Sequence, residues 1–218
     1  MIAGSLTERG TATTLGAMTG RVGIMGGTFD PIHLGHLVCA EEALHAFALD
    51  EVVFVPTGAP WQKRDREVTG AERRYEMTRL ATASNAAFRV ARSEIEREGP
   101  TYTIDTLRDF HAEGGGKSSL FFITGADAIR RILTWKDPAD VLALATFIAA
   151  TRPGHELGGL DHLEESLRGS VRVLEIPALA ISSTDIRERV RTGRPYRYLV
   201  PEPVAGYIAR SGLYREEP

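Results

Sequence analysis

The sequence predicts an α/β fold: a doubly wound, Rossmann-like parallel sheet with helices on both faces, in a single domain that ends in a small helical portion. Two observations predict it. Apolar runs of strand length recur along the chain, and segments of helical periodicity lie between them. This alternation is typical of a parallel sheet with right-handed crossovers. The 218 residues are enough for one domain with a sizeable core.

Strands are expected where apolar residues run without interruption, as in strands buried on both faces of a sheet. These runs are residues 22–25, 52–56, 88–91, 120–124, 147–150 and 171–174. Helices are expected where apolar residues recur every three or four positions. These segments are 37–49, 71–83, 103–111, 128–133, one that starts at Asp137-Pro138, one that opens at 181–187, and 201–210. Thr69 and Glu72 have capping-box spacing ahead of the second helix.

Composition excludes several classes of protein. A hydrophobic fraction of 43% and a charged fraction of 25% are those of a globular chain. A formal net charge of -3 gives no support for broad binding of nucleic acid, so any anion site must be local. The lone Cys39 excludes a disulfide framework and a cysteine-rich zinc site, and its place in the first helical pattern favours core packing.

The ends of the chain and its location follow from similar observations. Residues 1–20 hold small and polar residues without the pattern of a secretory signal, so we expect a disordered extension there and one domain over 21–218. No apolar run is long enough to suggest a membrane span. A reducing cytoplasm fits the cysteine usage best. The sequence leaves open whether the chain forms a homo-oligomer.

The stretch from Gly26 to His36 reads GGTFDPIHLGH and follows the first apolar run. Two glycines let the backbone approach an anion closely, and the helix behind them offers unpaired amides. His33 and His36 are three residues apart and share a face if the helix has begun. The stretch therefore predicts a phosphate site. The alternatives are an ordinary Gly-Gly turn and a histidine that only caps the helix.

A second anion site is indicated near the C-terminal end. Ser182, Ser183 and Thr184 offer hydroxyls and free amides at a helix start, and Arg187 lies about one turn later. Taken alone, this segment is equally well a capped helix with a surface arginine. Two helix starts that face the same edge of the sheet would instead make a polyphosphate site.

Further candidates follow strands at the same edge of the sheet, where ligands bind in doubly wound folds. Trp135 could stack on a flat aromatic ring, or it could simply pack between helices. Glu94 and Glu96 read as solvated charges, since nothing near them has metal-ligand spacing. The other candidates are the loop of Trp61 to Lys63, the segment 125–127, and Arg152.

These motifs resemble a known family. The GGTFDPIHLGH stretch resembles the GGTFDPxHxGH signature of HxGH nucleotidyltransferases, and residues 181–187, ISSTDIR, resemble their ISxTxIR signature. Between them, residues 100–103, 125–127, 134–135 and 152–154 are similar, in order, to the bacterial nicotinate-mononucleotide adenylyltransferases. The resemblance covers about residues 20–215. It implies transfer of AMP from ATP to nicotinate mononucleotide, giving deamido-NAD and pyrophosphate, without an enzyme-bound adenylate.

The resemblance also implies residue roles on the ATP side. His33, His36 and Arg187 would be catalytic, with His36 making the strongest contact to the transition state. The β- and γ-phosphates would be held by the second signature, and Mg²⁺ would bridge phosphate oxygens. The implied ATP-binding residues are Gly26, Gly27, Thr28, Phe29, His33, His36, Asp127, Ser182, Ser183, Thr184 and Arg187.

On the acceptor side, Trp135 would stack on the pyridine ring, and amides near Thr103 and Lys136 would bind the nicotinate carboxylate. Tyr102 would line the same subsite, Arg152 would contact the mononucleotide phosphate, and Lys63 would be a basic loop residue.

The chain departs from the family pattern in one loop. Many bacterial members carry Pro-Pro-His-Lys/Arg where this chain has Pro60-Trp61-Gln62-Lys63. We expect this loop to move when substrate binds. Two other functions stay open: another member of the superfamily, such as pantetheine-phosphate adenylyltransferase or a cytidylyltransferase, and a non-catalytic nucleotide sensor.

Overall fold

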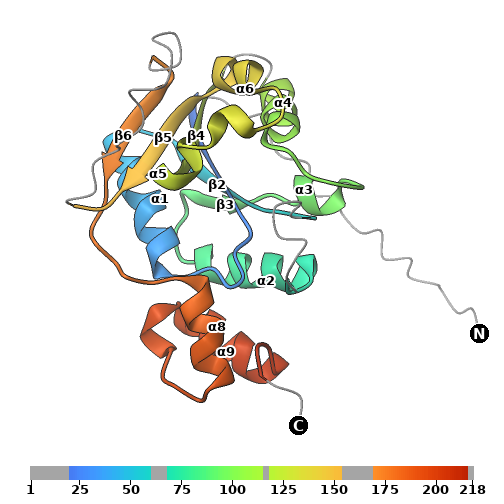
Figure 1. Cartoon of the computed structure of the whole chain (residues 1–218), viewed down its shortest axis with the longest axis vertical. Helices are drawn as coiled ribbons and strands as arrows, with labels where there is room; N and C mark the ends of the chain where they lie inside the picture. The colour runs from blue at the N-terminus through green and yellow to red at the C-terminus, as the bar shows by residue number, and fades with distance from the viewer. Residues whose placement is uncertain (1–19, 60–67, 115–117, 154–168, 216–218) are drawn as a thin grey trace, which may run out of the picture.

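A six-stranded, wholly parallel sheet forms the centre of the computed structural model, which describes residues 20–59, 68–114, 118–153 and 169–215 (Figure 1). The spatial order of the strands is β3-β2-β1-β4-β5-β6. Their bounds are β1 Gly20–Gly27, β2 Glu51–Pro56, β3 Phe88–Val90, β4 Ser118–Gly125, β5 Thr146–Thr151 and β6 Val171–Glu175.

The helices alternate with these strands, as the sequence predicts. In chain order, the helices before α6 in the described residues are α1 Leu34–Ala46, α2 Ala71–Thr82, α3 Ser93–Glu96, α4 Thr103–Glu113, α5 Ala126–Ile129 and the 3₁₀ helix η2 Ile132–Thr134. The rest are α6 Pro138–Leu144, α8 Ser183–Arg191, the 3₁₀ helix η4 Arg197–Leu199 and α9 Glu202–Ser211.

The winding direction reverses between β1 and β4. Strand β1 is central and pairs with β2 on one side and β4 on the other, with Gly27 opposite Pro56 and Ile24 opposite Phe122. The chain moves outward through β2 and β3 and then returns to β4, β5 and β6. A crevice therefore opens at the carboxyl ends of β1 and β4, the usual ligand site of such a sheet.

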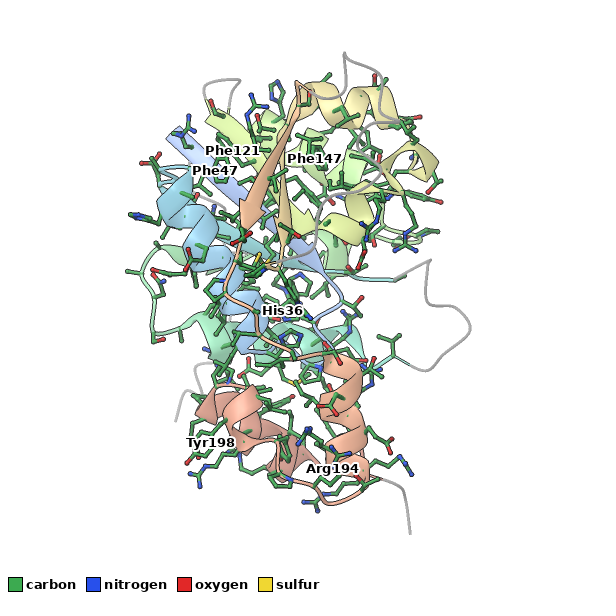
Figure 2. All side chains as sticks on the ribbon, turned by 60° about the vertical axis from the view of Figure 1, so that its left-hand side comes forward. His36, Phe47, Phe121, Phe147, Arg194 and Tyr198 are labelled. Carbon is green, nitrogen blue, oxygen red and sulfur yellow. The ribbon has the colours of Figure 1, made fainter. Side chains whose placement is uncertain are left out.

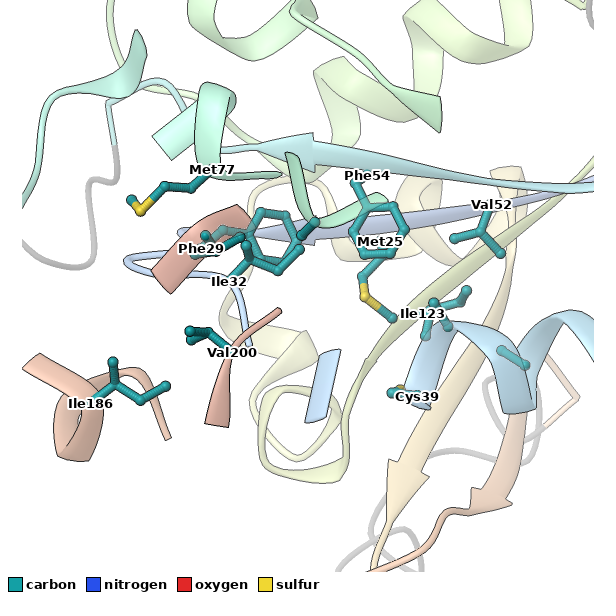
Figure 3. Packing of buried hydrophobic residues seen from close by; sticks show 14 of the residues in the cluster. Met25, Phe29, Ile32, Cys39, Val52, Phe54, Met77, Ile123, Ile186 and Val200 are labelled. Atoms are coloured by element: carbon teal, nitrogen blue, oxygen red, sulfur yellow. The ribbon is translucent and has the colours of Figure 1, made fainter. Parts of the chain in front are cut away.

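Two apolar layers cover the two faces of the sheet, which confirms the doubly wound prediction. One layer packs alternate strand residues such as Phe54 and Ile123 against α1, α2 and the C-terminal helices. Figure 3 shows Ile186 and Val200 reaching this layer from the C-terminal part of the chain. The other layer packs the intervening strand residues against α4 and α6. Cys39 is buried in the first layer, as predicted.

The C-terminal helices α8 and α9 lie together at one end of the molecule, next to α2 (Figure 1). They form the small helical portion that the sequence predicts. Within the described residues, no helix is both long enough and apolar enough to cross a membrane.

Some local predictions were wrong. No capping box starts α2: its N-cap is Gly70, and Glu72 pairs instead with Arg92 at 2.6 Å. Thr69 lies one residue too early to cap, and its carbonyl accepts a hydrogen bond from Arg74. The expected helix over 128–133 is divided into α5 and η2.

Candidate active site

Two glycines make close contacts where β1 leads into α1. A Cβ on Gly27 would lie 2.7 Å from the ring of Phe29, and one on Gly35 would lie 3.1 Å from the ring of His33. Phe29 has a φ of +48° and is 3% exposed. Its ring meets the ring of His36 edge-on, with 5.1 Å between centroids. Phe29 therefore packs against the ring of His36 and limits how that ring can turn.

The two histidines form a stacked pair at the start of α1. Their ring centroids are 3.7 Å apart with an interplanar angle of 23°. His33 is the N-cap, and its backbone N–H donates to Nδ1 of His36 at 3.1 Å. Because Nδ1 accepts this bond, the neutral imidazole of His36 carries its proton on Nε2. His36 can thus donate a hydrogen bond to an anion. In Figure 2, His36 lies between the sheet and the C-terminal helices.

His33 is kept uncharged by its surroundings. It is 7% exposed, and its Nδ1 is buried with no hydrogen-bond partner among the described residues. Burial and, to a lesser extent, the positive charge of Arg152 lower the pKa of His33 to about 4. At neutral pH, His33 is therefore a neutral imidazole.

The second signature lies against this loop, although it follows by about 150 residues. Ser183 donates from Oγ to the carbonyl of Pro31 at 2.9 Å, and Arg187 donates from Nη1 to the carbonyl of Asp30 at 2.7 Å. Arg187 also donates to the hydroxyl of Thr184 at 3.2 Å. Ser182 caps α8 by accepting from the N–H of Asp185. The first turns of α1 and α8 are thus joined through residues 30–31.

A cavity of about 760 Å³ opens at the carboxyl ends of β1, β4 and β5. Both histidines line it, and so do Asp127 and Arg152. Asp127 is exposed and pairs with Arg130, which also lines the cavity. Of the second signature, Ile181 lines this larger cavity in the described part of the chain, whereas Ser183 and Arg187 bond to the loop beside it.

A smaller cavity of about 280 Å³ adjoins the first. Trp135 lines it and packs edge-on against Phe122, with 6.1 Å between ring centroids. Lys136 lies over the ring of Tyr102, 4.7 Å from its centroid, and pairs with Asp105 at 3.3 Å. The packing alternative for Trp135 is therefore confirmed, and stacking on a bound aromatic ring stays a prediction. Gly26, Gly27 and Thr124 line both cavities.

The structure divides the candidate residues between the two cavities. The larger cavity receives Gly26, Gly27, Phe29, His33, His36, Asp127 and Arg152. The smaller cavity receives Gly26, Gly27, Thr28, Tyr102, Thr103, Trp135 and Lys136. Arg152, which the resemblance assigns to the acceptor phosphate, thus lies with the first group. Trp61, Gln62 and Lys63 lie outside the described residues, as does the extension up to residue 19.

Glu94 is buried at the wall of the smaller cavity, so its interpretation as a solvated charge was wrong. It is 7% exposed, lines the smaller cavity and accepts a 2.7 Å hydrogen bond from the hydroxyl of Thr106. Burial raises the pKa of Glu94, and the bond from Thr106 opposes that rise. Glu96, by contrast, is exposed and pairs with Arg92, as a solvated charge does.

Arg74 was missed altogether. It is 0% exposed and bonds to carbonyls of the loops that follow β1 and β2. Its position carries a signal: Arg74, Met77, Thr78 and Ala81 share the buried stripe of α2. A charged residue in an apolar stripe indicates a partner supplied by the fold.

Comparison with known proteins agrees with this geometry. The family model for cytidylyltransferase-like proteins matches residues 24–189. A probable nicotinate-nucleotide adenylyltransferase from Moorella thermoacetica is 58% identical over 200 residues, which cover 90% of this chain and 92% of that protein. Its counterpart from Corynebacterium kroppenstedtii is 57% identical over 194 residues, covering 89% and 90%.

A solved structure shares the fold at much lower identity. Plasmodium falciparum nicotinic acid mononucleotide adenylyltransferase complexed with NaAD matches with a TM-score of 0.71 and 20% identity, over 89% of this chain and 97% of that chain. The family model and the identity and coverage of the two relatives show that this chain belongs to the nicotinate-nucleotide adenylyltransferases, within the cytidylyltransferase-like nucleotidyltransferases.

Proposed function

We propose that this protein transfers the adenylyl group of ATP to the 5'-phosphate of nicotinate mononucleotide, forming deamido-NAD and pyrophosphate for NAD biosynthesis. The observation that carries the proposal is the pair of adjoining cavities that share Gly26, Gly27 and Thr124. The larger has room for a nucleoside triphosphate beside two imidazoles, and the smaller offers an aromatic slot. Two substrates bound this way meet at the glycines.

The reaction needs alignment and charge stabilisation more than a new nucleophile. The acceptor phosphate is already nucleophilic, so its oxygen attacks the α-phosphate in line and pyrophosphate leaves, with no covalent enzyme intermediate. Nε2–H of His36 would donate to the α-phosphate as its charge develops, while neutral His33 holds the His36 ring by stacking. Backbone groups of Gly27 and Thr28 would line the path of the transfer.

The outer phosphates fit the segment where α8 meets the loop. We propose that Ser182, Ser183 and Thr184 bind the β- and γ-phosphates through hydroxyls and the first amides of α8, with Arg187 adding a guanidinium. Arg187 already lies at the loop, through its bond to Asp30. Asp127, in α5 just after β4, would bind the ribose of ATP.

The acceptor fits the smaller cavity. We propose that Trp135 stacks on the pyridine ring, with Tyr102 beside it, and that amides near Thr103 and Lys136 bind the nicotinate carboxylate. Arg152 lines the larger cavity, yet the acceptor phosphate must reach the α-phosphate there in order to attack. Its position therefore suits contact with either phosphate. Lys63 stays the proposed basic loop residue.

Magnesium would come with the nucleotide. Among the described residues, no group of three or more His, Cys, Asp or Glu side chains could hold a metal ion. We propose that Mg²⁺ is bound through phosphate oxygens and water, the usual arrangement for this ion at polyphosphates. The partners we propose are small molecules, ATP and nicotinate mononucleotide, met in the cytoplasm.

An acceptor panel tests this proposal. Purified protein is given ATP and Mg²⁺ with nicotinate mononucleotide, nicotinamide mononucleotide or phosphopantetheine, and pyrophosphate release is measured with each. We expect the fastest release with nicotinate mononucleotide. Faster release with phosphopantetheine would make the protein a different member of the superfamily. ATP binding without release in any arm would make it a nucleotide sensor.

A further inference from the structure

Arg74 in α2 is a fully buried arginine that donates hydrogen bonds to four backbone carbonyls. Its side chain is 0% exposed. Nη1 donates to the carbonyl of Thr28 at 2.8 Å, and Nη2 donates to those of Thr57 and Gly58 at 2.6 and 3.1 Å. Nε donates to the carbonyl of Thr69 at 2.7 Å. One guanidinium therefore joins the loop after β1, the loop after β2 and the approach to α2.

The carbonyls that Arg74 holds belong to the walls of the site. Thr28 and Thr57 both line the smaller cavity. The two loops also touch directly, since the N–H of Thr57 donates to the carbonyl of Gly27 at 2.9 Å. Gly27 lines both cavities, so any change in the spacing of these loops moves the point where the two substrates would meet.

Acidic residues near Arg74 are occupied elsewhere. Among the described residues, Arg74 makes no ion pair within 4.0 Å. Asp30 accepts from Tyr214 at 2.8 Å, and Glu94 accepts from Thr106 at 2.7 Å. Burying a guanidinium without a directly paired carboxylate is expensive. Neutral donors could hold the loops for stability alone without this desolvation cost. The buried guanidinium therefore points to a requirement for its planar arrangement of N–H donors.

The loop after β2 also lies close to the backbone of α3. A Cβ on Gly58 would lie 2.0 Å from the carbonyl oxygen of Glu94 in α3. The loop is therefore held between its hydrogen bonds to Arg74 and its close contact with α3. Arg74 also holds the loop after β1, through its hydrogen bond to the carbonyl of Thr28.

We infer that Arg74 is a positioning residue that sets the spacing between the donor loop at Thr28 and the acceptor loop at Thr57 and Gly58. It governs turnover more than the affinity for either substrate. The inference rests on the proposed function, because it assumes that two substrates react where these loops meet. Arg74 touches neither substrate; it acts through the loops.

The test compares Arg74→Lys with Thr82→Val. Lysine keeps the charge but cannot reach four carbonyls in three segments. Thr82 is also buried in α2, and its hydroxyl donates to the carbonyls of Thr78 at 3.0 Å and Arg79 at 3.4 Å within the same helix, so it controls for lost stability. We expect Arg74→Lys to lower kcat about 100-fold. Dissociation constants for nicotinate mononucleotide and for a non-hydrolysable ATP analogue, measured separately by calorimetry, should change by only about threefold.

Thr82→Val should be destabilised and yet keep the kcat of the wild type. Equal losses of binding and turnover in Arg74→Lys, or a loss of kcat in Thr82→Val as large as in Arg74→Lys, would overturn the inference. If Arg74→Lys does not fold, Gly58→Ala moves the same loop with Arg74 intact. It should show the same split between kcat and affinity, and an unchanged kcat would overturn the inference.

Amide hydrogen exchange supplies a readout that does not depend on the substrate. In Arg74→Lys, the amides of residues 27–29 and 57–58 should exchange faster than in the wild type, whereas Thr82→Val should leave them unchanged. Unchanged exchange in Arg74→Lys would overturn the inference. A wild type that releases no pyrophosphate on the acceptor panel would instead remove the proposed function, and exchange would still show whether Arg74 holds the loops.

Discussion

The hydroxyl of Tyr214 donates a 2.8 Å hydrogen bond to Oδ1 of Asp30, across a sequence separation of 184 residues. Asp30 is 2% exposed, and its other oxygen accepts from the N–H of Thr69 at 3.4 Å. Arg187 donates to the carbonyl of the same residue. Asp30 therefore ties the loop between β1 and α1 to α8 and to the residues after α9. The C-terminal helices thus hold a loop of the candidate site in place.

Replacing Tyr214 with phenylalanine tests this tie. The change leaves a buried carboxylate with one partner fewer, so we expect Tyr214→Phe to lower the free energy of unfolding by about 1–3 kcal/mol. Urea unfolding measures it. Tyr198→Phe is the control, because Tyr198 is 83% exposed and should lose nothing measurable. Equal stability of the two variants would contradict a structural role for the bond.

The neutral state of His33 predicts a pH dependence of stability. The pKa of His33 is about 4 in the folded chain against 6.5 as its ordinary value. Between these values the unfolded chain binds a proton that the folded chain does not. The contribution is therefore fully present above pH 6.5 and is lost as the pH falls toward 4, reaching a loss of about 2 kcal/mol at pH 5.

Urea unfolding of the wild type and His33→Gln at pH 7.5 and pH 5 checks this sign. The wild type should lose about 2 kcal/mol more than the variant between the two pH values. Arg152→Gln removes the positive charge that also lowers the pKa of His33, so its loss should be smaller than that of the wild type. A wild type and His33→Gln that lose equal stability would show that His33 does not carry the effect.

The parts of the fold that could be predicted were those encoded by local periodicity. Buried strands such as 52–56 are recognisable as apolar runs, and the spacing of His33 and His36 places them on one helix turn. The partners of Arg74 and Glu94 could not be predicted in this way. Their partners are backbone carbonyls and a hydroxyl from other elements, which come together only once the strand order is known.

The resemblance supplied what periodicity could not. It related Arg187 to the histidine loop, and the structure joins them through Asp30. Which cavity each residue lines was beyond the sequence, because it depends on where the ends of β4 and β5 lie relative to β1. Arg152 shows this, since it lines the larger cavity and not the smaller one.

His36 should matter far more to turnover than to binding. As proposed above, its Nε2–H donates to the charge that develops on the α-phosphate, so His36→Ala should lower kcat by about 100- to 1000-fold with less effect on affinity for nicotinate mononucleotide. Steady-state kinetics and calorimetry separate the two quantities. The control is His45→Ala, at the exposed end of the same helix. Parallel losses of kcat and affinity would count against this role.

Replacing Trp135 tests which cavity takes which substrate. If it stacks on the pyridine ring, Trp135→Ala should raise the KM for nicotinate mononucleotide about 10-fold or more and leave the KM for ATP nearly unchanged. Because Trp135 also packs on Phe122 and Phe147, the variant should lose stability as well. Trp135→Phe keeps a flat ring and should recover most of the acceptor affinity, which lost packing alone would not explain. Leu133→Ala, at a side chain 53% exposed, controls for changes elsewhere in this segment. A rise in the KM for ATP alone would mean that the larger cavity takes the acceptor, and the assignment of the two cavities would have to be exchanged.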